Sequence, residues 1–294
     1  MTTELREHMT KSTDGTPIAW HELGSGAPVV TAGGLVGRRV VWEPLWRALG
    51  DRHRFVGWDY RGLWGSGRPD DLRRFSIDWH AEDGRAVMDA AHADSAVLVG
   101  WSTGVQVNFE MYRRWPERVV AMIVICGTYG RAFEGALGWR GTQHVIPRAA
   151  RAATQLHALV SSTLGRLAGN RRLVQYLKLS GAVGPTADEE ALRIMASELA
   201  AVDVTAFMSV VRRMGQHDAT DLLQDIAVPV LIVAGERDVL VPLRVAHKMA
   251  RRIPRADLLI IPDATHYAPI EYPELLSLRI EKFLREIGYG GTAS

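Results

Sequence analysis

The sequence has few of the residues that stabilise secreted or metal-binding chains. Its 294 residues include one cysteine, Cys126, so an intramolecular disulfide is excluded. Cys126 lies in the apolar run VVAMIVICG, where we expect a buried thiol that takes no part in chemistry. No cluster of cysteine and histidine has the spacing of a metal site. We therefore expect no metal site.

Long apolar runs and an excess of charge are also missing. Lysine and arginine number 35 against 33 aspartate and glutamate residues, so the charge balance gives no reason to expect nucleic-acid binding. The N-terminus, MTTELREHMTKSTDG, lacks the apolar core of a signal peptide, and no segment has the length needed to span a bilayer. The default expectation is a cytoplasmic protein. The chain length fits one domain with an insertion as well as it fits two domains.

A predicted strand and a predicted helix flank Ser102. Residues 96–99 (AVLV) form a short apolar run rich in β-branched side chains, which is typical of a buried strand. After Ser102, one helical face carries Val105, Phe109 and Tyr112, and the pattern stops just before a proline. Ser102 is therefore expected on the turn between the strand and the helix.

This turn has the sequence GWSTG, residues 100–104, which matches the pattern G-x-S-x-G. A sharp turn forces the serine into a strained conformation, and glycines are needed because side chains would collide with the adjoining strand and helix. The hydroxyl is then exposed beside the free N–H groups that begin the helix. The alternative is an ordinary turn that holds a serine, because short motifs also match by chance.

A nucleophilic serine needs a base and a group that orients this base. Of the ten histidines, His266 stands in a suitable place, because it follows the predicted strand ADLLII. Asp238 follows another predicted strand, VPVLIV, and the ends of parallel strands meet at one edge of a sheet. Glu236 and Asp263 are the nearest rivals for the acid. The alternatives are that His266 is a surface loop residue and that Asp238 caps a turn.

Together these motifs resemble the α/β-hydrolase superfamily. Its catalytic residues follow one another in the chain order serine, acid, histidine, which is the order of Ser102, Asp238 and His266 here. GWSTG is similar to its nucleophile elbow, GERD to its acid loop, THY to its histidine loop, and DYRGLWGSGRPD to its D-x-R-G segment. The resemblance covers nearly the whole chain. It implies an α/β fold with a mostly parallel central sheet flanked by helices and an inserted helical cap. Residues 1–130 and 221–294 would form the core, and residues 131–220 the cap.

The resemblance also implies an oxyanion hole made of two backbone N–H groups. One belongs to Thr103, directly after the serine, and the other to Leu35, in the loop GGLVGRRVVW. Gly33 stands where the family usually has histidine, so we expect a loop with little side-chain anchoring. Trp64 stands where the D-x-R-G-x-G-x-S pattern has glycine, and the sequence predicts no consequence of this change.

The cap segment has long helical patterns and no clear strand. Pro147 is predicted to begin a first helix, which extends to Leu167. Thr186 followed by a glutamate three residues later fits a capping box that begins another helix. A third helix is expected to begin after Asp203 and to end at Gly215.

The substrate pocket is expected to be apolar, which favours an apolar acyl or alcohol group. Its predicted wall residues are Trp101, Trp139, Tyr176, Met195, Phe207 and Met208. Apolar stripes on helices more often pack against a neighbouring element, so a core position is the alternative for most of these residues.

Basic residues dominate the first half of the cap segment, where Glu134 is the one acid. These basic residues are Arg131, Arg140, Arg148, Arg151, Arg166, Arg171, Arg172 and Lys178. A basic amphipathic cap can contact anionic lipid or guide an anionic substrate. A solvated helix face is the commoner explanation of such a run, so contact with a membrane surface is the less favoured interpretation.

The resemblance implies a cofactor-free serine hydrolase. We interpret the chain as a carboxylesterase for small or medium apolar esters, in which His266 takes the proton of Ser102 and Asp238 holds the imidazole. The alternatives are a carbon–carbon bond hydrolase, a lactonase or a perhydrolase with the same three residues, and a non-catalytic small-molecule receptor. Neither the natural substrate nor the oligomeric state follows from the sequence.

Overall fold

The computed structural model describes residues 4–133, 141–170 and 172–290, and an eight-stranded sheet forms its centre. The strands are β1 (Arg6–Lys11), β2 (Pro17–Leu23), β3 (Ala27–Ala32), β4 (His53–Trp58), β5 (Ala96–Trp101), β6 (Val119–Ile125), β7 (Val230–Gly235) and β8 (Ala256–Ile261). Their order in the sheet is β1-β2-β4-β3-β5-β6-β7-β8. The pairs β1–β2 and β2–β4 are antiparallel, and the other neighbouring pairs are parallel. The mostly parallel sheet expected from the sequence is confirmed.

The central strands are buried on both faces. All residues of β5 and β7 are buried, and Val120 is the exposed residue of β6. Their sequences are near-continuous runs of valine, leucine, isoleucine and alanine, as expected of parallel strands that helices cover on both sides. The strands predicted before Ser102, Asp238 and His266 are therefore present, as β5, β7 and β8.

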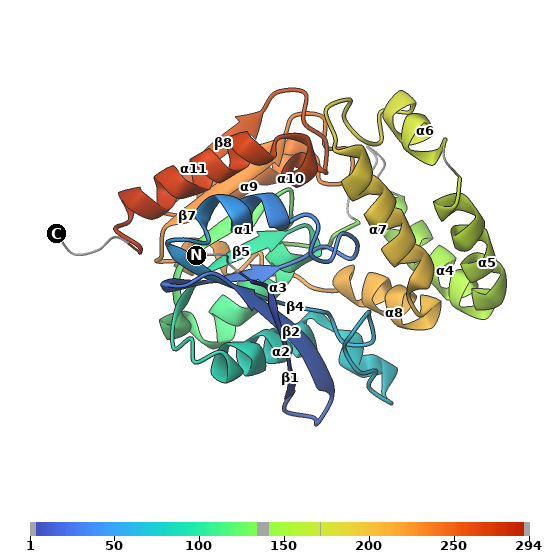
Figure 1. Ribbon diagram of the computed structural model, residues 1–294, viewed down its shortest axis with the longest axis horizontal. Helices are drawn as coiled ribbons and strands as arrows, with labels where there is room; N and C mark the ends of the chain where they lie inside the picture. The colour runs from blue at the N-terminus through green and yellow to red at the C-terminus, as the bar shows by residue number, and fades with distance from the viewer. Residues whose placement is uncertain (1–3, 134–140, 171, 291–294) are drawn as a thin grey trace.

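Six helices flank the sheet in the described part of the chain (Figure 1). They are α1 (Glu43–Leu49), α2 (Ile77–Ala90), α3 (Thr103–Arg114), α9 (Leu243–Arg252), α10 (Ala268–Glu271) and α11 (Pro273–Glu286). Alternate strand residues point to two apolar clusters. Val30 and Leu98 pack with α2, α3 and α9, whereas Val29 and Val97 pack with α1 and α11. Each buried side chain of this kind stabilises the fold by about 1.5–3 kcal/mol.

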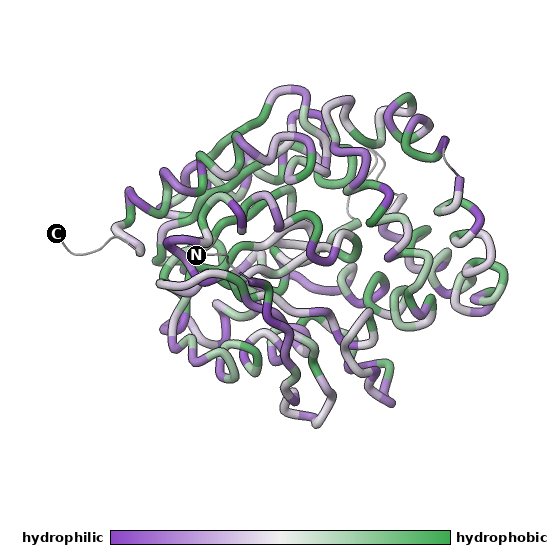
Figure 2. Tube along the Cα trace, viewed as in Figure 1, coloured by the Kyte–Doolittle hydropathy of each residue, from purple (hydrophilic) through white to green (hydrophobic). Residues whose placement is uncertain are grey.

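Between β6 and β7 the chain forms a set of helices that we call the helical insertion, residues 142–214. Its members are α4 (Thr142–Gln155), α5 (His157–Ala168), α6 (Leu173–Leu179), α7 (Glu189–Ala201) and α8 (Val204–Met214). In Figure 1 the insertion stands at one side of the sheet, and α5 lies at the edge farthest from it. Polar and apolar residues are mixed along these helices (Figure 2).

The ends of two insertion helices test the predicted caps. As predicted, α8 begins after Asp203, whose side chain accepts two backbone N–H groups of the first turn, and it ends at Gly215. The capping box predicted at Thr186 is wrong. The N-cap of α7 is Asp188, whose carboxylate accepts two N–H groups in the same way. A charged acceptor two positions later thus replaces the threonine hydroxyl.

The single helix predicted from Pro147 to Leu167 is also wrong. Pro147 lies inside α4, which begins five residues earlier at Thr142. The helix then breaks at Leu156, which has φ −103° and ψ 26°, and α5 begins at His157. A proline so near the start of a helix removes one hydrogen bond without ending it.

No single helix among the described residues is long and apolar enough to cross a membrane. The helices α7 and α8 reach the required length and composition only as a pair, and they are bent by 105° relative to each other. Buried residues of both helices, such as Met195 and Val210, belong to the apolar clusters of the fold.

Candidate active site

Ser102 occupies the turn between β5 and α3 in a backbone conformation that side chains rarely adopt. Its φ is 56° and its ψ is −117°. Its N–H donates to the carbonyl of Ile125 at 3.0 Å, and its own carbonyl accepts the N–H of Val105 at 3.1 Å. Such a conformation costs roughly 1–3 kcal/mol and persists where the surrounding structure holds it. The two bonds tie the serine to β6 and to α3.

Close packing explains the two glycines of the GWSTG turn. A Cβ atom on Gly104 would lie 1.9 Å from the carbonyl oxygen of Ala32 at the end of β3. A Cβ atom on Gly100 would lie 2.8 Å from Asn108 Nδ2 and from the backbone of Gly104. The requirement for glycine inferred from the sequence is therefore confirmed at both positions.

His266 lies between Ser102 and Asp238. Its Nε2 is 2.8 Å from Ser102 Oγ, and its Nδ1 is 2.8 Å from Asp238 Oδ2. The Asp238 side chain is 1% exposed and the imidazole 8%. The other carboxylate oxygen, Oδ1, accepts the N–H groups of Leu240 and Val241, each at 2.8 Å. A carboxylate fixed in this way favours a proton on Nδ1, which leaves Nε2 to accept one from the serine.

The two rival acids near this loop face elsewhere. Glu236 Oε2 accepts the N–H of Asp263 at 3.2 Å, and Asp263 pairs with the exposed guanidinium of Arg237 at 2.6 Å. Within the residues that the structure describes, neither carboxylate bonds to the ring of His266. Asp238 is therefore the acid in contact with the imidazole.

Trp101 supports the histidine from the end of β5. Its indole Nε1–H donates to the carbonyl of His266 at 2.9 Å, and the two ring centroids are 5.8 Å apart. The side chain is 1% exposed and belongs to the apolar cluster on the side of α1 and α11. The contacts of Trp101, a predicted substrate-binding residue, are thus with the histidine and the core.

Glu271, on α10, is a buried carboxylate that the sequence did not predict. Its Oε2 accepts the N–H of Thr265 at 2.7 Å. Its Oε1 accepts the Thr265 hydroxyl at 2.5 Å and the N–H of Gly184 at 2.7 Å. Thr265 precedes His266 in the chain, and Gly184 lies between α6 and α7. Glu271 therefore joins the histidine loop to the helical insertion. No local pattern marks it, because Gly184 is 87 positions away.

The loop after β3 passes close to Ser102 and is anchored by a tyrosine. A Cβ atom on Gly34 would lie 2.9 Å from the ring of Trp101 and 3.4 Å from Ser102 Cβ. The carbonyl of Gly33 accepts the hydroxyl of Tyr60 at 2.6 Å. The expected lack of side-chain anchoring is therefore wrong, because Tyr60 supplies an anchor from the end of β4.

The backbone amides of Leu35 and Thr103 lie on the two segments that meet at Ser102. No hydrogen bond within the described residues uses either N–H group. Thr103 is also the first residue of α3, whose N-terminal end carries a partial positive charge. Both amides are therefore free to donate to a negatively charged oxygen.

Trp64 has a positive φ of 48°, which explains why glycine is usual at this place in the family pattern. Its ring is half-buried and packs against the apolar cluster on the side of α2 and α3. Tryptophan at this position therefore introduces backbone strain and gains apolar contact.

An apolar cavity of about 250 Å³ lies between the helical insertion and the loops that carry the site. On the side of the sheet its wall consists of Val36 and Tyr267, which directly follow Leu35 and His266 in the chain. The other wall residues are Leu164, Leu167, Ala168, Leu173, Leu177, Val183, Leu192, Met195, Ala196 and Leu199. A cavity of this composition fits an apolar group.

Of the predicted wall residues, Met195 lines this cavity, whereas Trp101, Tyr176, Phe207 and Met208 lie outside its wall. Phe207 and Met208 are half-buried on α8, and Phe207 packs against the cluster on the side of α2 and α3. Trp139 lies outside the described residues. The leucines of α5 to α7 were missed because helical spacing alone does not separate a cavity wall from a core face.

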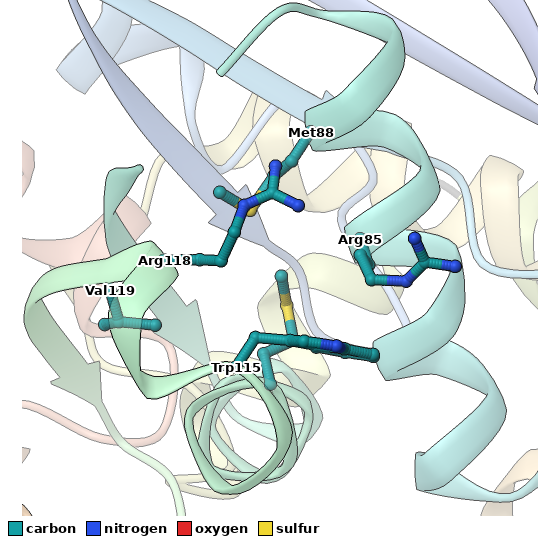
Figure 3. Close-up of a pocket in the computed structure, with 6 residues that line it drawn as sticks. Arg85, Met88, Trp115, Arg118 and Val119 are labelled. Atoms are coloured by element: carbon teal, nitrogen blue, oxygen red, sulfur yellow. The ribbon is translucent and has the colours of Figure 1, made fainter. Parts of the chain in front are cut away.

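A second crevice lies at the amino-terminal end of β6, away from Ser102. Its volume is about 10 Å³, and it is lined by Arg85, Met88, Met111, Trp115, Arg118 and Val119 (Figure 3). This is about the volume that one water molecule needs, so the crevice does not suit a substrate. No group of residues that could hold a metal ion occurs in the part of the chain that the structure describes.

Cys126 is buried, as expected, beside the histidine loop. Its Sγ lies 3.8 Å from the carbonyl of Thr265. Burial raises the pKa of the Cys126 thiol well above its usual value, with the charge of Asp238 adding to the effect. The thiol is therefore protonated at neutral pH and a poor nucleophile.

Residues 27–273 match the family model described as alpha/beta hydrolase fold. The pimeloyl-[acyl-carrier protein] methyl ester esterase of Aliivibrio salmonicida is 24% identical over 92% of this chain and 97% of that protein. The 2-(acetamidomethylene)succinate hydrolase of Mesorhizobium japonicum is 25% identical over 90% of each chain. A thermophilic esterase from Thermogutta terrifontis has the same fold, with a TM-score of 0.75 and 21% identity over 96% of this chain and 99% of that chain.

Proposed function

Because the chain belongs to the alpha/beta hydrolase fold family, we propose that it is a serine hydrolase that cleaves small or medium carboxylic esters with an apolar acyl or alcohol group. The hydrogen-bonded chain from Ser102 through His266 to Asp238 supports this proposal most directly. Each of its two distances is 2.8 Å, which is suited to a nucleophile, its base and the group that orients the base.

The reaction begins with proton transfer from Ser102. His266 Nε2 takes the hydroxyl proton as Oγ attacks the ester carbonyl, and the imidazole becomes positively charged. Asp238 holds the Nδ1–H and stabilises this charge without taking the proton itself. The buried position of the carboxylate strengthens the interaction, since little water screens it.

The attack places negative charge on the former carbonyl oxygen. The N–H groups of Thr103 and Leu35 donate to this oxygen, and the N-terminal end of α3 adds a favourable dipole. Donors that are fixed before the reaction require no reorganisation when the charge develops. The bond between Tyr60 and Gly33 serves this purpose, because it holds the loop that carries Leu35.

The intermediate then collapses to an acyl-enzyme. His266 gives its proton to the leaving alcohol as the bond between carbon and alcohol oxygen breaks. A water molecule next loses a proton to the same Nε2 and attacks the acyl group. The acid leaves, and the proton returns to Ser102 Oγ.

The apolar cavity supports the choice of substrate. Its wall follows directly on the residues that carry the oxyanion donor Leu35 and the base His266. A group bound there gains free energy from apolar burial, about 25 cal/mol for each Å² removed from water. Charged acyl groups would lose their hydration in the cavity without a partner.

The test is reaction of the purified protein with a fluorophosphonate probe beside the Ser102→Ala variant. We expect one label, on the peptide that contains Ser102, and none on the variant. A series of p-nitrophenyl esters of increasing acyl length then measures the substrate preference, with a lactone and a vinylogous diketone as competing substrate classes.

Absence of labelling in a folded sample would contradict an activated serine and favour a ligand-binding protein. Labelling of Ser102 together with faster cleavage of the diketone than of any ester would support Ser102 as the nucleophile. It would indicate a carbon–carbon bond hydrolase in place of an esterase.

A further inference from the structure

Helix α5 exposes apolar side chains to solvent. None of its residues is buried, although its sequence, HALVSSTLGRLA, contains four leucine or valine residues. Leu156, just before the helix, is 55% exposed, and Leu159 on the same face is 61% exposed. On α6, Tyr176 is 55% exposed and Leu179 is 85% exposed. A helix of a soluble protein normally buries its apolar stripe, so this surface needs an occupant.

Helices α4 to α6 carry positive charge without acidic residues. Residues 135–187 contain no aspartate or glutamate. Arg148, Arg151, Arg166 and Arg172 are exposed there, and no ion pair among the described residues joins any of them to a carboxylate. Elsewhere the surface arginines are commonly paired, as in the bridge between Arg113 and Asp221.

Exposed leucines beside these arginines match an anionic lipid surface, which has a charged head-group layer above an apolar acyl-chain layer. The guanidinium groups attract the phosphate and carboxylate groups of the lipid heads, and the leucines enter the boundary of the acyl chains. A second copy of this chain is a poorer fit, because the two basic faces would repel each other. The position of α5 at the outer edge of the molecule leaves this face open to a flat surface (Figure 1).

The inner side of the same helices lines the apolar cavity. Leu164 and Leu167 of α5, and Leu173 and Leu177 of α6, are wall residues. The same cavity is also lined by Tyr267 and Val36, beside the candidate site. Helix α5 thus contributes both to the exposed apolar surface and to the wall of the cavity.

We propose that the outer face of α5 and α6, formed by Leu156, Leu159, Tyr176, Leu179, Arg166 and Arg172, docks on an anionic lipid surface. The docked protein takes an amphiphilic ester from this surface into the apolar cavity. The docking does not depend on catalysis, whereas the delivery of an ester rests on the function proposed above.

The experiment is sedimentation of the full chain with vesicles of phosphatidylcholine alone or with added phosphatidylserine. The Ser102→Ala variant is used, so that hydrolysis plays no part. We expect the bound fraction to be at least about tenfold higher with phosphatidylserine, since each arginine near the surface strengthens the attraction to the anionic lipid. Raising the ionic strength should release the protein.

Two pairs of substitutions test the docking face against matched controls. Leu156→Ser with Leu159→Ser, and separately Arg166→Gln with Arg172→Gln, should each lower binding at least about fivefold. The controls are Leu275→Ser with Leu278→Ser on α11, which are 42% and 65% exposed, and Arg251→Gln with Arg252→Gln on α9. These should bind as the parent does.

Equal binding to both vesicle types, no binding at all, or equal loss in the control variants would overturn the docking. So would a dimer in light scattering that the leucine substitutions convert to monomer, because the face would then join two copies. If the leucine variant unfolds, the arginine pair decides the question.

Hydrolysis of a short, water-soluble ester by the same variants with Ser102 intact separates the two proposals. Vesicle binding without any ester cleavage would support the docking and contradict the proposed function. Ester cleavage without vesicle binding would support the proposed function and contradict the docking.

Discussion

The Asp238 carboxylate is held on both sides, by His266 Nδ1 and by two backbone N–H groups of its own loop. In an Asp238→Asn variant the amide oxygen would keep the two backbone donors, because they need an acceptor. The amide N–H₂ would then face Nδ1, which would have to accept a hydrogen bond through its lone pair. The proton of the neutral imidazole would move to Nε2, so that Ser102 would lose its base.

We therefore expect kcat for a p-nitrophenyl ester to fall by about 10³–10⁴-fold in Asp238→Asn, with the melting temperature nearly unchanged. Asp263→Asn is the matched control, because this exposed acid pairs with Arg237 and with no other basic residue among those that the structure describes. Its kcat should stay within about twofold of the parent. Comparable activity of the two variants would contradict the role of Asp238.

Glu271 contacts Thr265, the residue before His266, so under the function proposed above we expect it to act as a positioning residue. In Glu271→Gln one acceptor oxygen becomes a donor, which faces the N–H of Thr265 or of Gly184. The histidine loop should then lose its fixed position. We expect kcat to fall about tenfold with little change in KM, and the free energy of unfolding to fall by about 1–3 kcal/mol.

The rate of labelling by the fluorophosphonate probe, measured per folded molecule, separates positioning from stability. It should fall with kcat in Glu271→Gln and remain unchanged in Glu274→Gln, an exposed acid in the first turn of α11. A Glu271→Gln protein that is less stable but labels at the parent rate would show that the carboxylate only holds the fold together.

At the scale of one element, the N-terminus of α7 allows a comparison of the observed cap residue with the predicted one. Asp188 accepts the N–H groups of Glu190 and Ala191 at 2.8 and 3.0 Å, whereas the sequence pattern had favoured Thr186. Asp188→Ala should lower the free energy of unfolding by about 1 kcal/mol, because two donors of the first turn lose their acceptor.

Thr186→Ala should change the free energy of unfolding by less than about 0.5 kcal/mol, since the threonine does not cap the helix. Urea unfolding of both variants, followed by circular dichroism, measures the difference. A larger effect for Thr186→Ala would restore the capping box.

Elements whose signals are local were predictable from the sequence. The strand before Ser102, the two glycines around it and the start of α8 at Asp203 all depend on neighbours within a few positions. The parallel order of the strands then placed Asp238 and His266 at the same edge. The single helix predicted from Pro147 to Leu167 is wrong, because the break at Leu156 occurs without a proline or glycine to mark it.

At the scale of the whole molecule, long-range contacts were not predictable. Tyr60 bonds to Gly33, and Glu271 bonds to Gly184 across 87 positions, without any pattern at either end. The exposure of α5 was equally hidden, because its leucines recur at the spacing of a buried helix. A sequence records which side chains are apolar, but not which of them the fold covers.

Two buried histidines couple the stability of the whole molecule to pH. Burial lowers the pKa of His21 on β2 and of His80 on α2 to about 3, and neighbouring arginines add to the effect. In the unfolded chain these groups titrate near their ordinary pKa of 6.5. Between these values the unfolded chain binds more protons than the folded chain. The two histidines therefore do not affect the free energy of unfolding above about pH 6.5, and they lower it progressively as the pH falls towards 3.

A His80→Leu variant removes one of these groups and keeps a buried side chain in α2. Between pH 7 and pH 5 the parent should lose about 2 kcal/mol more of its free energy of unfolding than the variant, since the unfolded parent gains one additional proton. Urea unfolding at both pH values measures this. The exposed His157→Gln serves as control and should follow the parent, and parallel losses in all three proteins would contradict the coupling through His80.

The helical insertion leaves the sheet after β6 and returns at β7, two strands that pair directly with each other. The register of this pair, such as Met122 opposite Val230, involves no residue of the insertion. The pairing of the two strands therefore does not depend on the insertion, which contacts the core through bonds such as those of Gly184 with Glu271 and of Glu198 with Arg38. If the proposed function holds, evolution can vary the helices that line the cavity while the residues around Ser102 stay the same.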